Sequence, residues 1–396
     1  TLGDVPTALV TGSNGKTTTV RMLAAILAAA GHVVGRSTTD AVQVGETVLD
    51  TGDLSGPHGA RLALGDPRTT AAVLETARGG ILRRGLAMQR ADVAVVTTLA
   101  ADHLGGYGIT TLDELAEAKL VVARALGSLG VLVVNAEVEA LRRLAPARAQ
   151  RLCWIARDPH EPALAAHVHD GGMAAAVLDG AIALHANGAW RPIIAVASVP
   201  ATVGGAAWHN VLNALCAAAA AHVLGVGDAT IARALGRFGA DPRDNPGRLM
   251  RFERDGVQVI VDYAHNAQGV RALADVVQAM PAARRAIVLG TGGDRDDAAL
   301  AAMAQEAARP PGFACYVAKE TPQVARGRAP GEVSGVLVAA LVATGVPASA
   351  IVRATGDVDA ARQLLAWARP GDLLALPVHA EREAVLALLG AAPPTR

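Results

Sequence analysis

Lysine is scarce in this chain of 396 residues. Only Lys16, Lys119 and Lys319 are lysines, whereas the other 33 basic residues are arginines. Arginine and lysine serve equally well on a solvated surface, but they differ where the chemistry requires a compact ammonium group or a free amine. Each of the three lysines is therefore a candidate functional residue.

The chain also lacks an excess of charge of either sign, because 36 Lys and Arg side chains balance 36 Asp and Glu side chains. A protein that binds nucleic acid needs a basic excess to neutralise phosphates, so we expect no nucleic acid among the partners. Aromatic residues make up only 3% of the chain against 52% hydrophobic residues, so the core must consist mainly of Ala, Val, Leu and Ile.

Cysteine is sparse as well. Cys153, Cys216 and Cys315 lie far apart without a CxxC pair, which favours free thiols and a cytoplasmic protein over a disulfide framework. The longest apolar run, near residues 214–221, is too short to span a bilayer, and no signal peptide is visible, so we expect no membrane partner. The chain begins with Thr1 rather than Met, which leaves a module upstream open.

Apolar runs alternate with helical patterns, which predicts an α/β fold. Strands that are apolar throughout are typical of a mainly parallel sheet covered by helices on both faces. In the first part of the chain, strands are expected at residues 7–11, 71–74, 93–96 and 131–134, helices at 17–30, 112–126, 206–224 and 229–238, and a hairpin at 174–185.

The segment DPRDNPG at residues 241–247 is the best linker candidate, since it is dense in Pro, Asp and Gly. After it the alternation resumes, with strands expected at 257–261, 286–289 and 373–376 and a helix at 269–280. The length agrees with more than one domain. We therefore predict a larger nucleotide-binding α/β domain over residues 1–243 and a smaller α/β domain over 244–396.

A glycine-rich turn follows the first strand and precedes a helix, which is the context of a phosphate-binding loop. Glycines allow successive backbone N–H groups to converge on anionic oxygens, and the helix N-terminus adds a favourable partial charge. Lys16 would hold the β- and γ-phosphates of a nucleotide, and the Thr17 hydroxyl would bind Mg²⁺. The expected nucleotide-binding residues of this loop are Gly12, Ser13, Asn14, Gly15, Lys16, Thr17 and Thr18.

Magnesium requires further oxygen or nitrogen ligands from neighbouring strand ends. Glu75 ends the strand at 71–74, and Asp102 and His103 follow the strand at 93–96. Glu75 or His103 alone could be a solvated surface group, but the occurrence of both beside a phosphate loop favours a metal site. Lys119 lies within an apolar helical stretch. The alternative to a functional role there is a side chain that extends along the apolar surface to place its ammonium in solvent.

Together these motifs resemble the Mur ligase superfamily of ATP-dependent carboxylate–amine ligases, and more narrowly the Mur-like C-terminal half of the cyanophycin synthetases. The matching segments follow in order over almost the whole chain. They are TGSNGKTTT (11–19), LSGPHGARLAL (54–64), VLETARGGILRRGL (73–86), ADHLG (101–105), WHNVLNALCAA (208–218), NPGRL (245–249), VDYAHN (261–266), GGDRDD (292–297) and RGRAPGEV (326–333).

The resemblance implies a P-loop Mur ligase central domain with a mainly parallel sheet and a smaller Rossmann-like α/β C-terminal domain. It implies that the enzyme uses ATP and one or two Mg²⁺ ions, with Thr17, Glu75 and His103 as metal ligands. Lys119 falls where many Mur ligases carry a carbamylated lysine, which supports a second Mg²⁺. Lys16, Glu75, His103 and Lys119 thus join the expected catalytic residues.

The resemblance also assigns residues around the nucleotide and the substrates. Asn210 and Asn213 match the adenine-side pair, Arg248 the phosphate-side arginine and Asp262 the acid that binds ribose. His265 is implied as a catalytic residue that faces the nucleotide and substrate. The expected substrate residues are Arg78, Gly79, Gly80, Asn266 and, as the weakest candidate, Lys319.

The chain departs from the family pattern at three positions and in its length. Thr98 replaces a common Asn, Ala267 replaces a Pro, and Thr321 stands where related chains tend to be acidic. These changes concern substrate identity more than the use of ATP. Neither the amino-terminal substrate domain of Mur ligases nor the ATP-grasp module of cyanophycin synthetases is present in the sequence.

The function implied is an ATP-dependent ligase that joins a small-molecule or peptide carboxylate to an amino-acid amine through an acyl phosphate, with arginine as one candidate amine. One alternative is a nucleotide-dependent subunit that requires a partner protein, since the substrate domain is missing. Another is a glutamate ligase like folylpolyglutamate synthetase, against which the ETARGGIL stretch argues. Under each of these functions, the partners could include further copies of this chain or an upstream ATP-grasp protein.

Overall fold

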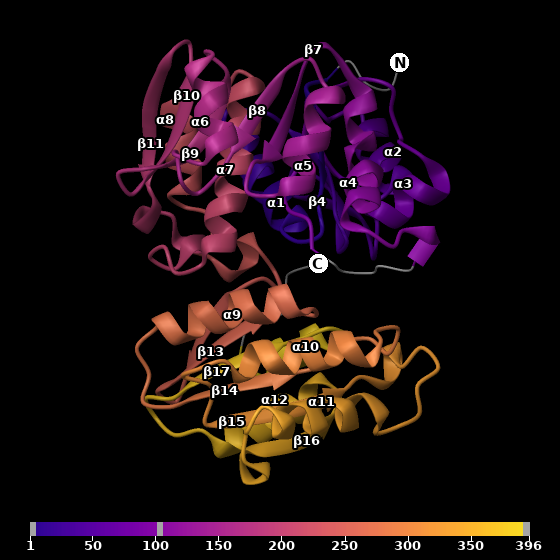
Figure 1. Cartoon of the computed structure of the whole chain (residues 1–396), viewed down its shortest axis with the longest axis vertical. Coiled ribbons are helices and arrows are strands. Elements are labelled where there is room, and N and C mark those ends of the chain that lie inside the picture. The colour runs from indigo at the N-terminus through magenta and orange to yellow at the C-terminus, as the bar shows by residue number, and fades with distance from the viewer. Residues whose placement is uncertain (1–4, 101–105, 391–396) are drawn as a thin grey trace. The chain divides into compact units, whose positions relative to one another are not determined.

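The computed structural model describes residues 5–100 and 106–390. The chain divides into two compact units, Thr1–Ala240 and Asp241–Arg396, each of which contains one sheet (Figure 1). The boundary lies at the start of the Pro- and Asp-rich segment 241–247. The α/β class predicted from the sequence is confirmed in both units.

The first unit is built on an eleven-stranded sheet with the order β11-β10-β9-β8-β7-β6-β1-β5-β2-β3-β4. The seven strands from β9 to β2 run parallel, and an antiparallel hairpin extends the sheet at each edge. The strands are β1 (Thr7–Thr11), β2 (Val34–Ser37), β3 (Ala41–Val44), β4 (Thr47–Thr51), β5 (Ala71–Glu75), β6 (Ala91–Val96), β7 (Leu126–Asn135), β8 (Leu152–Ile155), β9 (Met173–Leu178), β10 (Ala181–Ala186) and β11 (Ala189–Ala195).

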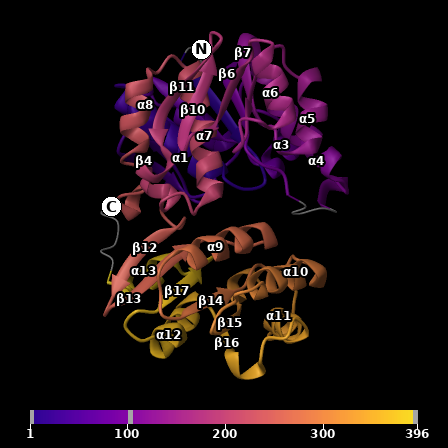
Figure 2. The same ribbon diagram turned by 60° about the vertical axis from the view of Figure 1, so that its left-hand side comes forward.

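Helices cover both faces of this sheet. Three of them, α1 (Lys16–Ala29), α7 (Trp208–Val223) and α8 (Asp228–Leu235), share one hydrophobic core with the sheet (Figure 2). The opposite core contains residues of α2 (Pro57–Gly65), α3 (Arg78–Arg84), α4 (Leu112–Leu120), α5 (Glu139–Leu144) and α6 (Pro162–His169).

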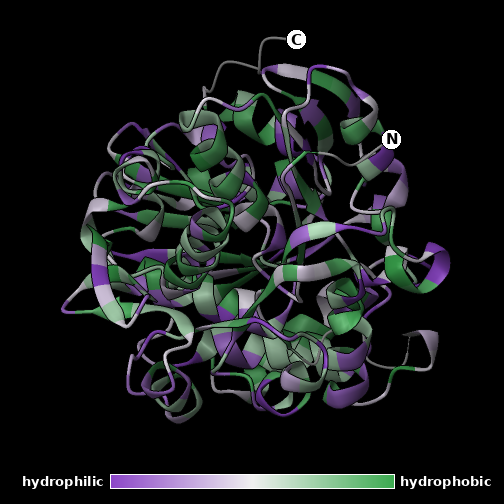
Figure 3. Ribbon diagram, turned by 90° about the horizontal axis from the view of Figure 1, so that it is seen from above, coloured by the Kyte–Doolittle hydropathy of each residue, from purple (hydrophilic) through white to green (hydrophobic). Residues whose placement is uncertain are grey.

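The apolar composition of the strands follows from this arrangement. Ala8 and Val10 of β1 pack into one core, and Leu9 between them packs into the other. A strand buried on both faces must be apolar at every position, because successive side chains point to opposite faces. Figure 3 colours the ribbon by hydropathy and shows hydrophobic stretches in its interior and many hydrophilic stretches in the helices and loops at its periphery.

The second unit contains a six-stranded sheet with the order β12-β13-β17-β14-β15-β16, in which only the β12–β13 pair is antiparallel. The strands are β12 (Met250–Arg254), β13 (Val257–Asp262), β14 (Arg285–Leu289), β15 (Cys315–Glu320), β16 (Ile351–Thr355) and β17 (Leu373–Pro377). Helix α10 (Asp297–Ala308) packs between α9 (Ala267–Ala279) and α11 (Glu332–Ala343), and α12 (Asp357–Trp367) packs against α13 (Arg382–Leu388).

The structure contains short strands that were not predicted, and one predicted helix is shorter than expected. The hairpin β3–β4 and its neighbour β2 were not predicted, because these strands have only four or five residues, and β2 and β4 contain Gly, Ser or Thr. The helix expected at 112–126 ends as α4 at Leu120 and continues as a tighter 3₁₀ turn, Val121–Ala125. All three cysteines are buried and free. Among the described helices, none is both long and apolar enough to cross a membrane.

Asp372, directly before β17, is the buried partner in an ion pair with Arg284. Its carboxylate accepts two hydrogen bonds from Arg284, at 3.1 and 2.5 Å, and one from the backbone N–H of Arg369 at 2.8 Å. Burial opposes ionisation of Asp372, but the bonds from Arg284 and Arg369 lower its pKa overall. The Arg284 guanidinium also stacks on the Trp367 ring, 4.1 Å from its centroid.

Replacing Asp372 by Ala should lower the free energy of unfolding of the second unit by about 1–3 kcal/mol, since the half-exposed Arg284 keeps part of its hydration. Because the pKa of Asp372 is lowered on folding, this contribution is fully present above its unfolded pKa and is lost progressively as the pH falls through its folded pKa. Urea denaturation at pH 7 and pH 3, with unfolding of β14 and β17 followed by pulsed hydrogen exchange, measures both effects.

The matched control is Asp275→Ala, which removes an exposed partner of Arg271 and should change the free energy by less than about 1 kcal/mol. Equal losses for the two variants, or a loss at Asp372 that is as large at pH 3 as at pH 7, would contradict the assignment.

Candidate active site

The phosphate loop leaves the carboxyl end of β1 and enters α1 at Lys16. Gly15 caps α1 with a φ of 84°, in the left-handed region that favours glycine. A Cβ atom at Gly15 would lie 2.1 Å from Asn213 Oδ1, and one at Gly12 would lie 1.9 Å from Thr97 Oγ1. Both positions therefore exclude a side chain on steric grounds.

The end of β6 fixes the other side of this loop. The backbone N–H of Ser13 donates to Thr98 O at 2.8 Å, and the Thr97 hydroxyl donates to Asn14 O at 2.6 Å. Asn14 N–H donates to the Thr98 hydroxyl at 3.2 Å. Thr98, one of the departures from the family pattern, thus contacts the loop through both its backbone and its side chain.

Two of the three lysines contact the phosphate loop. Lys16 Nζ donates to Ser13 O at 3.0 Å. Lys119 Nζ donates to Gly12 O at 2.9 Å, and the residue is only 3% exposed. The alternative that Lys119 snorkels to solvent is therefore wrong, whereas its carbamylation stays a prediction.

Hard oxygen donors gather beside the loop. The Thr17 hydroxyl donates to Glu75 Oε2 at 2.9 Å and lies 3.1 Å from the Thr39 hydroxyl. The backbone N–H of Thr39 also donates to Glu75 Oε2, at 3.3 Å. Glu75 is 1% exposed. A buried carboxylate with hydroxyl groups fits Mg²⁺, which prefers oxygen ligands. His103, the third expected ligand, lies outside the described residues.

Thr39 was missed by the sequence analysis because it follows β2, a strand that was itself not predicted. The signal available was the polar run Ser37-Thr38-Thr39-Asp40 after the apolar pair Val33-Val34.

The expected adenine-side pair lies at the start of α7, and both residues are buried. Asn213 Oδ1 accepts from the Thr19 hydroxyl at 3.3 Å, and its amide nitrogen donates to Asn210 Oδ1 at 3.0 Å. Asn210 in turn donates to Ala201 O at 2.7 Å. In this structure Asn213 therefore packs against the phosphate loop at Gly15. An adenine contact for Asn210 or Asn213 stays a prediction.

The expected substrate residues Arg78, Gly79 and Gly80 form the first turn of α3. A Cβ atom at Gly80 would lie 3.2 Å from Gly56 Cα, so this helix approaches the segment before α2 closely. The Arg78 guanidinium lies 5.9 Å from the centroid of the Tyr107 ring. A side chain at Gly80 would therefore require the segment at Gly56 to shift by a few tenths of an ångström.

In the second unit, the expected residues gather after β13. Asp262 accepts a hydrogen bond from Leu249 N–H at 2.8 Å, next to Arg248. The Arg248 guanidinium lies 4.2 Å from the centroid of the Tyr263 ring. Arg248 and Asp262, assigned to the phosphates and the ribose, are thereby neighbours.

The two residues after Ala264 have distinct local roles. The Thr291 hydroxyl donates to His265 O at 3.0 Å, and the His265 imidazole lies 2.9 Å from Tyr263 O through Nδ1. Asn266 caps α9 by accepting from Gly269 N–H at 2.8 Å. Substrate contacts of His265 and Asn266 stay predictions.

Lys319 has a different environment from the one expected of a substrate residue. It is fully buried at the end of β15, where its ammonium group forms an ion pair with Asp357. A substrate can reach this nitrogen only if the surrounding residues move.

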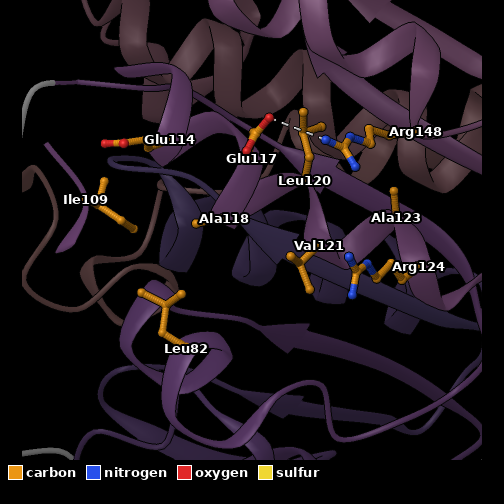
Figure 4. Close-up of a pocket in the computed structure, with 10 residues that line it drawn as sticks. All are labelled: Leu82, Ile109, Glu114, Glu117, Ala118, Leu120, Val121, Ala123, Arg124 and Arg148. Atoms are coloured by element: carbon orange, nitrogen blue, oxygen red, sulfur yellow. Dashed lines mark ion pairs between the residues drawn. The ribbon is translucent and has the colours of Figure 1, made fainter. Parts of the chain in front are cut away.

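One pocket of about 320 Å³ lies between α3 and α4 (Figure 4). Apolar side chains such as Leu82, Ile109 and Val121 line it, together with the ion pair of Glu117 and Arg148 at 3.5 Å. None of the expected site residues that the structure describes lines this pocket. It therefore lies on a different side of α4 from the face that directs Lys119 to the phosphate loop.

Comparisons with protein families agree with this geometry. Residues 10–221 match the family described as the Mur ligase middle domain, and residues 247–376 match the Mur ligase glutamate ligase domain. The chain belongs to the Mur ligase family. The first match contains the phosphate loop, Glu75 and Asn213, and the second contains the loop after β13.

Among relatives, cyanophycin synthetase of Synechocystis sp. is 37% identical over 335 residues, which are 84% of this chain and 38% of that protein. Cyanophycin synthetase of Trichormus variabilis is 38% identical over 85% of this chain and 37% of its own length. The chain thus spans little more than a third of these relatives. The UDP-N-acetylmuramoyl-L-alanyl-D-glutamate–2,6-diaminopimelate ligase of Corynebacterium glutamicum is 28% identical over 92% of this chain and 68% of that protein.

Solved Mur ligase structures have the same fold. MurF from Acinetobacter baumannii matches with a TM-score of 0.65 and 19% identity, over 98% of this chain and 77% of that one. MurF from Thermotoga maritima, determined in complex with ADP, matches with a TM-score of 0.63 and 17% identity, over 97% of this chain and 78% of that one. The predicted central fold with a smaller second α/β unit is confirmed.

Gly15→Ala should weaken the binding of a non-hydrolysable ATP analogue by about tenfold or more, because a left-handed φ and the contact with Asn213 each cost about 1–3 kcal/mol. Isothermal titration calorimetry measures the change. Gly31→Ala is the matched control, since Gly31 also has a positive φ, of 98°, but a Cβ atom there would meet nothing within 4 Å. Equal affinities for the two variants would show that the packing of Asn213 against the loop is unimportant.

Proposed function

We propose that this chain is an ATP-dependent carboxylate–amine ligase that works through an acyl phosphate. The observation that carries the proposal is a phosphate loop with Lys16, directly beside the buried pair of Thr17 and Glu75, in a chain of the Mur ligase family. These groups suit the transfer of a phosphoryl group, in which charge spreads over the transferred oxygens.

In the first step, an oxygen of the substrate carboxylate attacks the γ-phosphorus of ATP, and the bond to the bridging oxygen of ADP breaks. Backbone N–H groups of the loop 12–15 and the Lys16 ammonium would hold the phosphate oxygens during this transfer. Bound Mg²⁺, held by Thr17, Glu75 and His103, would supply neutralisation of the phosphate charge.

In the second step, the nitrogen of an amine attacks the acyl carbon, inorganic phosphate leaves, and the amine loses a proton. Exclusion of water protects the acyl phosphate from hydrolysis before the amine arrives. We assign Lys119 and His265 to the catalytic groups, with a carbamate at Lys119 as part of this proposal.

We further propose that residues 1–243 form the ATP-binding central domain and residues 244–396 the C-terminal domain of a Mur ligase. Arg248 and Asp262 would contact the phosphates and the ribose, and Asn210 and Asn213 the adenine side. Arg78, Gly79, Gly80 and Asn266 would lie on the substrate side. The three buried, free thiols support a cytoplasmic protein.

The relatives named as cyanophycin synthetases make arginine the first amine to test. The second candidate function is a nucleotide-dependent subunit that needs a partner protein, an alternative that the motifs leave open. An oligomer of this chain, or a separate ATP-grasp protein, would supply such a partner.

The ligase proposal predicts that ADP release depends on both an acid and an amine. A matrix of amino-acid amines against carboxylates, including peptides that end in aspartate, should contain pairs that release ADP, and hydroxylamine should trap a hydroxamate from the acyl phosphate. ADP release that is independent of the amine, with no hydroxamate from any carboxylate, would refute the proposal. Activity that appears only with a co-purified partner would favour the subunit, and activity with glutamate alone would favour a folylpolyglutamate-synthetase-like ligase.

Glu75→Gln should raise the Mg²⁺ concentration needed for half-maximal ADP release by about tenfold or more, because the variant loses a buried anionic ligand. Titration of Mg²⁺ at saturating ATP measures the shift. Glu46→Gln is the matched control, since Glu46 is exposed in the turn between β3 and β4. An unchanged Mg²⁺ requirement in Glu75→Gln would remove this residue from the metal site.

A further inference from the structure

A buried polar network lies at the carboxyl ends of the parallel strands in the second unit. Its centre is Lys319, at the end of β15, which is fully enclosed. Its Nζ donates to Asp357 and to Pro377 O at 2.8 Å, and it lies 3.4 Å from His379 Nδ1. The ammonium therefore joins β15 to the start of α12 and to the end of β17.

Asp357 holds the segment after β17 in place. Its Oδ2 accepts hydrogen bonds from the backbone N–H groups of His379, Ala380 and Glu381 at 3.1, 2.7 and 2.8 Å. Burial alone would raise the pKa of Asp357, but the Lys319 ammonium and these N–H groups bring the pKa down to about 2. Burial lowers the pKa of Lys319 as well, but the Asp357 carboxylate opposes that shift through its direct contact with the ammonium, so each partner stabilises the charge of the other.

His379 carries the network to the loop after β13. Since its Nδ1 faces the Lys319 ammonium, Nδ1 accepts and the proton resides on Nε2. Nε2 lies 3.1 Å from Ala264 O and donates to it. Burial, the Lys319 charge and His265 lower the pKa of His379 well below its usual value, so the imidazole is neutral.

Ala264 lies in the middle of the loop 262–266, between Asp262 and His265. The Tyr263 ring packs edge-on against His379, with centroids 5.3 Å apart, and against His265 at 5.2 Å. The conformation of the loop that presents Asp262 and His265 therefore depends on where His379 is held.

We propose that Lys319 is a positioning residue, which orients His379 and thereby holds the loop 262–266 in the conformation needed for ligation. This inference rests on the proposed ligase function and replaces the expected substrate contact of Lys319. Lysine suits this place because the site encloses a compact ammonium with three acceptors, which the larger planar guanidinium of arginine does not match.

The test uses two variants of His379 that separate its two contacts. In His379→Gln, the amide nitrogen can take the place of Nε2 and donate to Ala264 O. In His379→Asn, the shorter amide can face Lys319 but does not reach Ala264. We expect His379→Asn to lower kcat by about tenfold to a hundredfold, because a small misplacement of catalytic groups has effects of this size, and His379→Gln to recover most of that loss.

The structural readout is hydrogen exchange of the peptide that spans residues 261–268, measured on the full chain. Exchange in this peptide should rise in His379→Asn, stay close to the parent in His379→Gln, and remain unchanged in Arg362→Gln, a control on the exposed side of α12. Exchange in β14 shows whether each variant is folded. The exchange measurement needs no substrate. It therefore tests whether His379 holds the loop 262–266 even if no acid–amine pair releases ADP and the ligase proposal is refuted.

Lys319 is tested in the pair Lys319→Met with Asp357→Asn, which leaves no unpaired charge in the interior. If Lys319 acts through His379, adding His379→Asn to this pair should cause little further loss of kcat, since coupled residues are not additive. The KM values for ATP, acid and amine should change less than kcat.

Two results would overturn the proposal. The first is a rise in the KM of one substrate in the Lys319 pair with unchanged exchange in residues 261–268, which would indicate direct substrate contact. The second is that adding His379→Asn to the Lys319 pair lowers kcat by the same factor as His379→Asn does alone. That result would show that Lys319 and His379 act independently.

Discussion

The close packing of the phosphate loop constrains the rest of the first unit. Its backbone has no room for a side chain at Gly12 or Gly15, because Thr97 lies against one and Asn213 against the other. The loop is thus shaped by β6 and α7 as well as by its own glycines. Lys119, from α4, contacts the loop through Gly12 O. Helices on both faces of the sheet therefore support one short turn.

Buried charge plays a similar part in the second unit. The ion pair of Lys319 and Asp357 links the ends of β15 and β17 with α12, and His379 extends that link to Ala264. A buried ion pair contributes little to net stability when compared with an apolar replacement, but it does fix geometry where every polar atom is satisfied. Such a network suits a place where a loop must be held in one conformation.

The sequence was sufficient for features that depend on local pattern. The strands at 71–74 and 93–96 and the phosphate loop were predicted because apolar runs and glycine spacing are local signals. Strands β2 to β4 were missed, since strands of four or five residues give a weak local signal and β2 and β4 contain Gly or Thr. The burial of Lys319 could not be predicted, because its partners Asp357 and His379 lie 38 and 60 residues further along the chain and meet it only in the folded unit.

The contact between Gly15 and Asn213 also has a consequence for biosynthesis. The first strand, loop and helix leave the ribosome early, but α7 is made almost two hundred residues later. Until then the underside of the loop has no asparagine against it, so the first βα segment cannot form a complete phosphate site by itself. Long-range contacts of this kind form late in folding. The nascent chain should acquire nucleotide affinity only when most of the first unit has been synthesised.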